Sequence, residues 1–133
     1  MANFNDDGNC FVCGSANPVG LKLRFRAKDE DQEAEADVVF PANLQGWKDT
    51  VHGGLLATVL DEAMVKAAAA AGIKCVTVEI SVKFKKPVAT GVAYTVNGKV
   101  LGIQGRIITA ESSVKDDSGQ VLALATGKLF KLV

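Results

Sequence analysis

The chain's single histidine, His52, stands directly before two glycines, Gly53 and Gly54, at the start of a long apolar segment. If that segment is a helix, its first backbone N–H groups lack partners and lie at the positive end of the helix dipole. They could therefore bind an anion or a polarised carbonyl oxygen. Asp61 follows His52 by nine residues. The pattern indicates an oxyanion donor and a general base, the two groups that hydrolysis of a reactive carbonyl compound needs.

These residues depend on a helix predicted over Gly54–Ala71. The segment contains no proline and no internal glycine, is dominated by alanine and leucine, and is followed by Gly72. Its polar side chains Thr58, Glu62 and Lys66 recur every four residues and form one narrow stripe. We expect Glu62 to be a surface residue that pairs with Lys66. Nearly all other residues are apolar, so the helix should be covered on most sides.

Asp61 lies off that polar stripe, by about 60° to 100° on a helical wheel. A carboxylate in this position requires a reason, because burying it without a partner is costly. Structural interpretations remain open for both candidates. His52 and its glycines could form only a tight turn into the helix, and Asp61 could hydrogen-bond to a loop or across a subunit interface.

The rest of the chain is predicted to be mostly β-strand after an irregular lead-in over residues 1–19. Residues Val76 to Phe84 alternate apolar and polar side chains without interruption, which predicts a strand with one face on a core. Two turns compete later, at Asn97–Gly98 and at Gly102–Gly105. The strands are expected at Leu21–Ala27, Ala34–Phe40, Val76–Phe84, Val92–Ile103, Arg106–Lys115 and Val121–Leu132, with a charged turn at Lys28–Asp31. One buried helix beside such a sheet is an α+β arrangement.

Length and composition limit the possible classes of protein. The 133 residues fit a single domain, and fifteen Lys and Arg balance fifteen Asp and Glu, so no basic field exists to attract nucleic acid. We expect neither a membrane span nor a signal peptide, and hence a cytoplasmic protein. Cys10, Cys13 and Cys75 should then be free thiols. A single Cys-x-x-Cys without a second pair is weak evidence for zinc, so no metal and no cofactor are expected.

The stretch from His52 through Asp61 to Met64, HGGLLATVLDEAM, resembles the signature of the hotdog-fold thioesterases, in particular the phenylacetate-pathway (PaaI-like) branch. The lead-in CFVCGSANPVGL and the strand that ends in FKKP at Pro87 also resemble this superfamily. The resemblance implies a hotdog fold, with a curved antiparallel sheet wrapped around one long helix. It also implies a strand over Val92–Ile103 with the turn near Gly102–Gly105, which leaves Asn97–Gly98 as a bulge.

The resemblance further implies a role for each residue of the site. The Gly53 N–H would polarise the thioester carbonyl, and His52 would hold that turn or the leaving sulfur. Asp61, from the neighbouring subunit, would be the general base or the nucleophile. Thr77, ten residues before the strand-ending proline, would orient the attacking water.

The same resemblance implies an acyl-CoA substrate, with Gly54 and Asn43 as substrate-binding residues, although the loop from Gly46 to His52 is longer than in several relatives. It also implies a homodimer with shared sites, which pairs again into a tetramer. Helix geometry agrees, because nine residues at 1.5 Å each separate His52 from Asp61 by about 13 Å. One subunit therefore cannot easily bring both groups to one substrate.

Two other functions remain possible. Glu62-Ala63-Met64 resembles a helix stretch of the hotdog-fold acyl-thioester dehydratases, but those enzymes carry their histidine well upstream of the helix, and Phe40-Pro41 has none beside it. A non-catalytic acyl-CoA binding module is the third possibility. The acyl group itself is not specified by the sequence.

Overall fold

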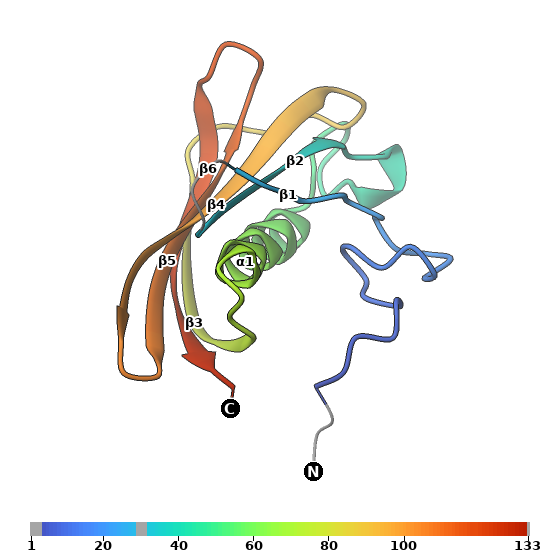
Figure 1. The fold of residues 1–133 in the computed structure, drawn as a ribbon. Helices are drawn as coiled ribbons and strands as arrows, with labels where there is room; N and C mark the ends of the chain where they lie inside the picture. The colour runs from blue at the N-terminus through green and yellow to red at the C-terminus, as the bar shows by residue number, and fades with distance from the viewer. Residues whose placement is uncertain (1–3, 29–31, 133) are drawn as a thin grey trace.

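The computed structural model describes residues 4–28 and 32–132. Within these residues it contains one α-helix and one six-stranded antiparallel sheet, which curves around the helix (Figure 1). The strands lie in the order β1-β2-β4-β5-β6-β3, which confirms the expected α+β arrangement. The elements are β1 (Arg26–Ala27), β2 (Glu33–Val39), a short 3-10 helix (Ala42–Leu44), α1 (Gly53–Ala70), β3 (Cys75–Phe84), β4 (Ala93–Gln104), β5 (Ile107–Lys115) and β6 (Val121–Lys131).

Helix α1 supplies the centre of the core and is displaced by one residue from its predicted bounds. It ends at Ala70, and Gly72 follows in a left-handed conformation (φ 78°) that glycine adopts without steric cost. Among the described residues, no helix is long and apolar enough to cross a membrane. The fully enclosed side chains of α1 face the sheet: Leu56, Val59, Leu60, Ala63, Met64, Ala67 and Ala68.

Asn97–Gly98 is neither a turn nor a bulge. Both residues lie inside β4, in regular register with β2 and β5. A Cβ on Gly98 would overlap the carbonyl group of Ala63, so glycine is required for the helix to lie this close to the sheet. The bulge of β4 falls at Leu101 instead. The turn after β4 contains Gly105, with a φ of 62°, and thus agrees with the later of the two predicted positions.

Strand β3 also departs from the uninterrupted alternation that its sequence predicts. Its register against β6 shifts between Thr77 and Glu79, which leaves Val78 as a bulge. Before the bulge Thr77 faces α1, and after it Val82 and Phe84 face α1. The strand therefore presents odd-numbered residues to the helix in one half and even-numbered residues in the other.

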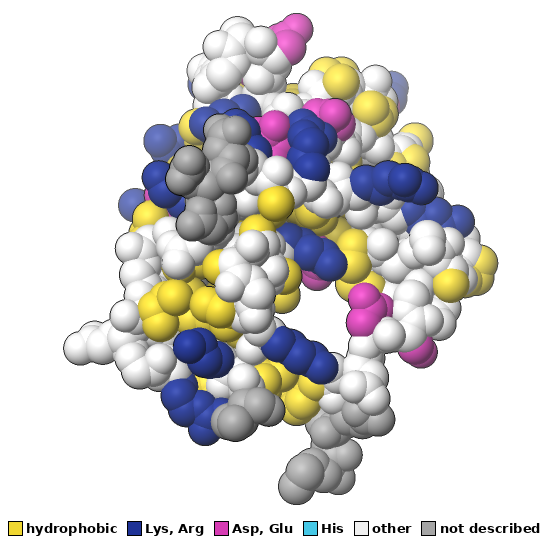
Figure 2. Space-filling model, viewed as in Figure 1, with side chains coloured by type: hydrophobic (Ala, Val, Ile, Leu, Met, Phe, Trp, Pro, Cys, Tyr) yellow, Lys and Arg dark blue, Asp and Glu magenta, His cyan; other side chains and the backbone are white. Residues whose placement is uncertain are grey.

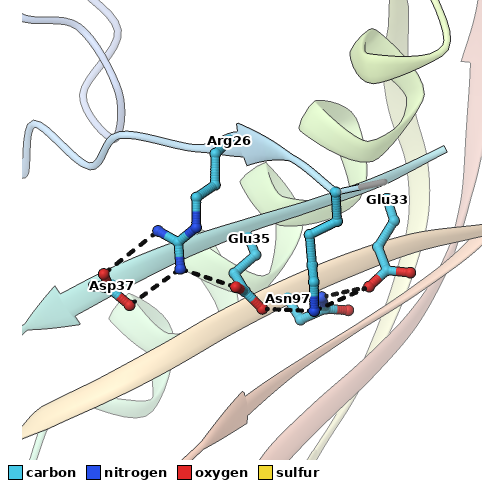
Figure 3. A network of polar contacts seen from close by, with 6 residues as sticks. Arg26, Glu33, Glu35, Asp37 and Asn97 are labelled. Carbon is cyan, nitrogen blue, oxygen red and sulfur yellow. Dashed lines mark hydrogen bonds and ion pairs between the residues drawn. The ribbon is translucent and has the colours of Figure 1, made fainter. Parts of the chain in front are cut away.

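The first strand is shorter than predicted. Of the expected Leu21–Ala27 segment, only Arg26 and Ala27 pair with β2, and most of the predicted charged turn at Lys28–Asp31 lies outside the described residues. Acidic side chains of β2 alternate with buried residues. They form ion pairs with two basic side chains, one in β1 and one directly after it (Figure 3). This network joins Arg26 to Glu35 and Asp37, Lys28 to Glu33 and Glu35, and Asn97 to Glu33.

Over residues 4–19 the predicted irregular lead-in is confirmed, but this segment is packed against the protein rather than extended into solvent. It lies beside α1, on the side away from the sheet (Figure 1). Val12 is almost fully buried in the core, and backbone hydrogen bonds join Leu21 to Phe11 and Leu23 to Val12. The helix is therefore covered by the sheet on one side and by the lead-in on another.

Candidate functional site

A small loop places His52 at the start of α1. Residues Gln45 and Val51 form an isolated antiparallel bridge, and the buried Val51 donates its N–H to the Val88 carbonyl at 2.8 Å. The next N–H, that of His52, donates to the Leu44 carbonyl at 2.9 Å. The backbone around His52 is therefore fixed from both sides before the helix begins.

His52 is the N-cap of the helix. Its Nδ1 accepts a hydrogen bond from the Gly54 N–H at 2.9 Å, so the neutral imidazole carries its hydrogen on Nε2. The Gly54 N–H is thereby occupied. Among the described residues, the Gly53 N–H has no acceptor, so it is the free donor at the positive end of the helix.

A hollow of about 420 Å³ opens beside this donor. It is lined by Gly46, Trp47, Val51, His52 and Gly53. Trp47 stands at its edge with 86% of its surface exposed, and the ring of Phe84 lies next to Gly53. Sequence reasoning missed these two aromatic neighbours. For Trp47 the sequence offered one signal: it is an aromatic residue inside a loop that otherwise consists largely of turn-forming residues.

Asp61 lies elsewhere on the helix, half-buried against β3. The Thr77 hydroxyl donates to Asp61 Oδ1 at 2.5 Å. Burial raises the pKa of the neighbouring Cys75 thiol, and the Asp61 carboxylate raises that pKa further. The structure thus brings two of the predicted site residues, Asp61 and Thr77, into contact within one chain, and this contact depends on the bulge that turns Thr77 toward the helix.

The structure does not bring the remaining candidates together in one chain. Gly53 and Asp61 are eight residues apart on a continuous helix, so their backbones are separated by about 12 Å. Asp61 is not among the residues that line the hollow beside Gly53. Asn43, in the 3-10 helix, lines a different hollow with Pro41 and Leu44.

Glu62 is not the solvent-exposed residue that the sequence predicts. Only 15% of its side-chain surface is exposed to solvent, because the lead-in covers it. Lys66 lies 4.0 Å from its carboxylate, as expected, but Cys10 Sγ lies 3.8 Å from the same oxygen. Glu62 and Asp61, adjacent in sequence, therefore face different parts of the protein.

The cap at His52 gives a first testable prediction. Replacement with alanine leaves the Gly54 N–H without its acceptor, so the free energy of unfolding should fall by about 0.5–2 kcal/mol. Asparagine, whose side-chain oxygen can also accept at an N-cap, should restore most of this loss. Urea unfolding of the wild type, His52→Ala and His52→Asn measures both effects. Equal stability of all three proteins would contradict the capping role.

Comparisons with known proteins show what the fold resembles. The family model of the thioesterase superfamily matches residues 48–123, more than half of the chain. No curated protein matches. A crystal structure of a thioesterase superfamily protein has 26% sequence identity and a TM-score of 0.87, and the match covers 94% of this chain and 61% of that one. The present chain therefore spans less than two thirds of that relative.

Two further structures share the fold. The E. coli PaaI protein from the phenylacetic acid degradation operon has 19% identity and a TM-score of 0.77, with 85% of this chain and 81% of that one covered. A hypothetical thioesterase protein from Streptococcus pneumoniae, in complex with coenzyme A, has 17% identity and a TM-score of 0.76, with coverages of 83% and 85%. Variants of that protein in which an aspartate or a threonine is replaced with alanine share the fold as well.

The family match includes the loop around His52, helix α1 and strands β3 to β5. It therefore contains the free N–H at the helix start as well as the carboxylate and the threonine that contacts it. The curved sheet and the enclosed helix agree with the resemblance found in the sequence. The chain belongs to the thioesterase superfamily and has its hotdog fold.

Proposed function

We propose that the protein is a cytoplasmic acyl-CoA thioesterase, which hydrolyses a thioester to a free acid and the CoA thiol. The observation that carries this proposal is the hydrogen bond from Thr77 to Asp61. Thr77 holds Oδ1 and orients the carboxylate, which leaves Oδ2 to take the proton of an attacking water molecule. The coenzyme A bound to the S. pneumoniae relative supports the choice of thiol.

Each group then has one step in the reaction. The Gly53 N–H donates to the thioester oxygen and stabilises the negative charge that develops there as water attacks the carbonyl carbon. Asp61 accepts the water proton. The carbon–sulfur bond then breaks, and the CoA thiolate takes up a proton. His52 fixes the donor by occupying the neighbouring Gly54 N–H, and its Nε2–H can donate to the leaving sulfur. The Gly54 N–H already donates to His52 and Asn43 lines a separate hollow, so the proposed mechanism assigns neither residue a step in the reaction.

The complete site is proposed to form between two subunits. Within one chain Gly53 and Asp61 are separated by about 12 Å, too far for both to contact the same reacting carbon. Strand β3 is the last strand of the sheet, and its edge is unpaired within the described residues. Ile80 and Phe84 on this strand are 37% and 55% exposed. Such an apolar edge requires a cover, and a second copy of the chain would supply both the cover and the missing group.

The same proposal includes the pairing of these dimers into tetramers, because the resemblance to the superfamily implies it. The dehydratase alternative would assign the chemistry to Glu62. That carboxylate lies against Cys10 and Lys66 rather than against Thr77, so the contacts of the helix favour Asp61 as the reacting acid.

The proposal is tested by incubating the protein with a panel of aryl-acetyl, hydroxybenzoyl, and short- and medium-chain fatty acyl-CoA esters while the released thiol is measured. We expect turnover of at least one class. Micromolar binding of an ester with no turnover of any of them would instead identify a binding module and refute the hydrolase.

A further inference from the structure

Two cysteines of the lead-in meet the central helix at Glu62. The Sγ atoms of Cys10 and Cys13 and a carboxylate oxygen of Glu62 all lie within 4.8 Å of one another. Glu62 lies about fifty positions after the two cysteines in sequence, and the fold brings the three side chains together. The hollow at this junction, of about 410 Å³, is open at the surface between the lead-in and the body of the protein (Figure 2).

The loop that carries the cysteines is held in a defined shape. The Gly14 N–H donates to the Cys10 carbonyl at 2.9 Å, and a Cβ at Gly14 would overlap the backbone of Cys10, so only glycine fits. Between the two cysteines, Val12 is inserted into the core. Both sulfur atoms are therefore directed to one side of a tight turn whose position is fixed by packing.

Glu62 is mostly withdrawn from solvent, with 15% of its side chain exposed, and its contacts are long: 3.8 Å to Cys10 Sγ and 4.0 Å to Lys66 Nζ. A mostly buried carboxylate usually has short, charge-assisted contacts. A small cation between Glu62 and the two sulfur atoms would provide them.

The spacing of the three groups suits a tetrahedral Zn²⁺ ion. Zn–S bonds near 2.3 Å and Zn–O bonds near 2.0–2.2 Å place two sulfur ligands about 3.8 Å apart, and a sulfur and an oxygen about 3.6 Å apart. The Cys10 Sγ to Glu62 Oε2 distance of 3.8 Å is already close to this value. All three ligand atoms lie within 4.8 Å of one another, so side-chain rotations that move them by about 1 Å would bring them to these distances.

The charges also balance. Two thiolates and one carboxylate carry three negative charges, and Zn²⁺ with the adjacent Lys66 ammonium carries three positive charges. Lys66 lies next to both Glu62 and Cys13. The group as a whole would therefore be neutral, which lowers the cost of enclosing it.

We infer that Cys10, Cys13 and Glu62 bind one Zn²⁺ ion, with water as the fourth ligand, and that this ion fastens the lead-in to helix α1. The site is structural. Glu62 faces the lead-in while Asp61 faces β3, so the ion does not contact the proposed reaction centre. Sequence reasoning gave little weight to the Cys-x-x-Cys motif because no second cysteine pair accompanies it; the third ligand proposed here, Glu62, lies on the distant helix.

Two measurements test the inference on the full-length protein. Metal analysis of protein purified without a metal-affinity step should find about one zinc per chain. Titration of the metal-free protein with Co²⁺ should produce thiolate-to-metal charge-transfer absorption. Removal of the metal should also increase the rate of proteolysis within the lead-in, because that segment is then no longer fastened to the helix.

The ligand variants Cys13→Ser and Glu62→Gln should weaken metal binding by about a hundredfold or more. Their matched controls, Cys75→Ser and Glu79→Gln, should bind as the wild type does, since neither residue belongs to the cluster. Circular dichroism checks that each variant is folded. A wild-type protein that binds neither Zn²⁺ nor Co²⁺, retention of the metal by Glu62→Gln or Cys13→Ser, or a disulfide between Cys10 and Cys13 in the isolated protein would overturn the inference.

Discussion

Asp61→Asn is expected to lower kcat by about a hundredfold or more while KM changes little. Asparagine keeps the size of the side chain, and its amide oxygen can still accept the hydrogen bond from Thr77. It cannot, however, take a proton from water. The loss therefore falls on the chemical step rather than on substrate binding. Steady-state hydrolysis of the best ester from the panel measures it.

The matched control for this variant is Asp117→Asn, which makes the same chemical change at an exposed turn residue. It should hydrolyse the ester at the wild-type rate. Asp61→Asn with nearly full activity would remove the base from the mechanism, and with it the assignment of the reacting carboxylate.

Gly53→Pro is expected to lower kcat by about 10²–10³-fold, the usual effect of losing one oxyanion donor. Proline has no backbone N–H, so this change deletes the proposed donor itself. The local backbone tolerates it, because Gly53 is the first residue of the helix and His52 before it is extended, with φ −59° and ψ 132°. Thermal unfolding should therefore show a stability close to that of the wild type.

Gly53→Ala is the companion control, because alanine retains the N–H. Its Cβ would meet the Phe84 ring at 3.5 Å, an ordinary contact, so most activity should remain. If the proline and alanine variants lose activity equally, the effect comes from the shape of the hollow and not from the donor.

Much of the fold was predictable from local signals in the sequence. The glycine after Ala71 marked the end of the helix, and alternation or β-branched residues marked the later strands. The bulge at Val78 was not predictable, because the alternation continues through it and only pairing with β6 reveals the shift. Gly98 was misinterpreted for a similar reason. Asn-Gly is a turn signal in isolation, but here the glycine accommodates the approach of Ala63 on the helix.

The candidate site was predictable to the extent that it depends on one helix. The spacing of His52 and Asp61 is a property of the segment itself. The position of Asp61 off the polar stripe likewise predicts that it faces another part of the protein than Glu62, as it does. The environment of Glu62 could not be predicted, because it depends on where a lead-in without regular structure packs. The occupation of the Gly54 N–H by His52 likewise depends on a side-chain conformation that no pattern encodes.

The central claim is that each site combines Gly53 of one subunit with Asp61 of the other, and subunit complementation tests it most directly. Asp61→Asn and Gly53→Pro chains, each with a different affinity tag, are co-expressed and the mixed oligomer is isolated through both tags. A mixed dimer with shared sites contains one site with both defects and one intact site. It should therefore recover between about a quarter and a half of wild-type activity, while each variant alone remains nearly inactive. A mixed oligomer as inactive as its parents would show that both groups act within a single chain, and would contradict the account.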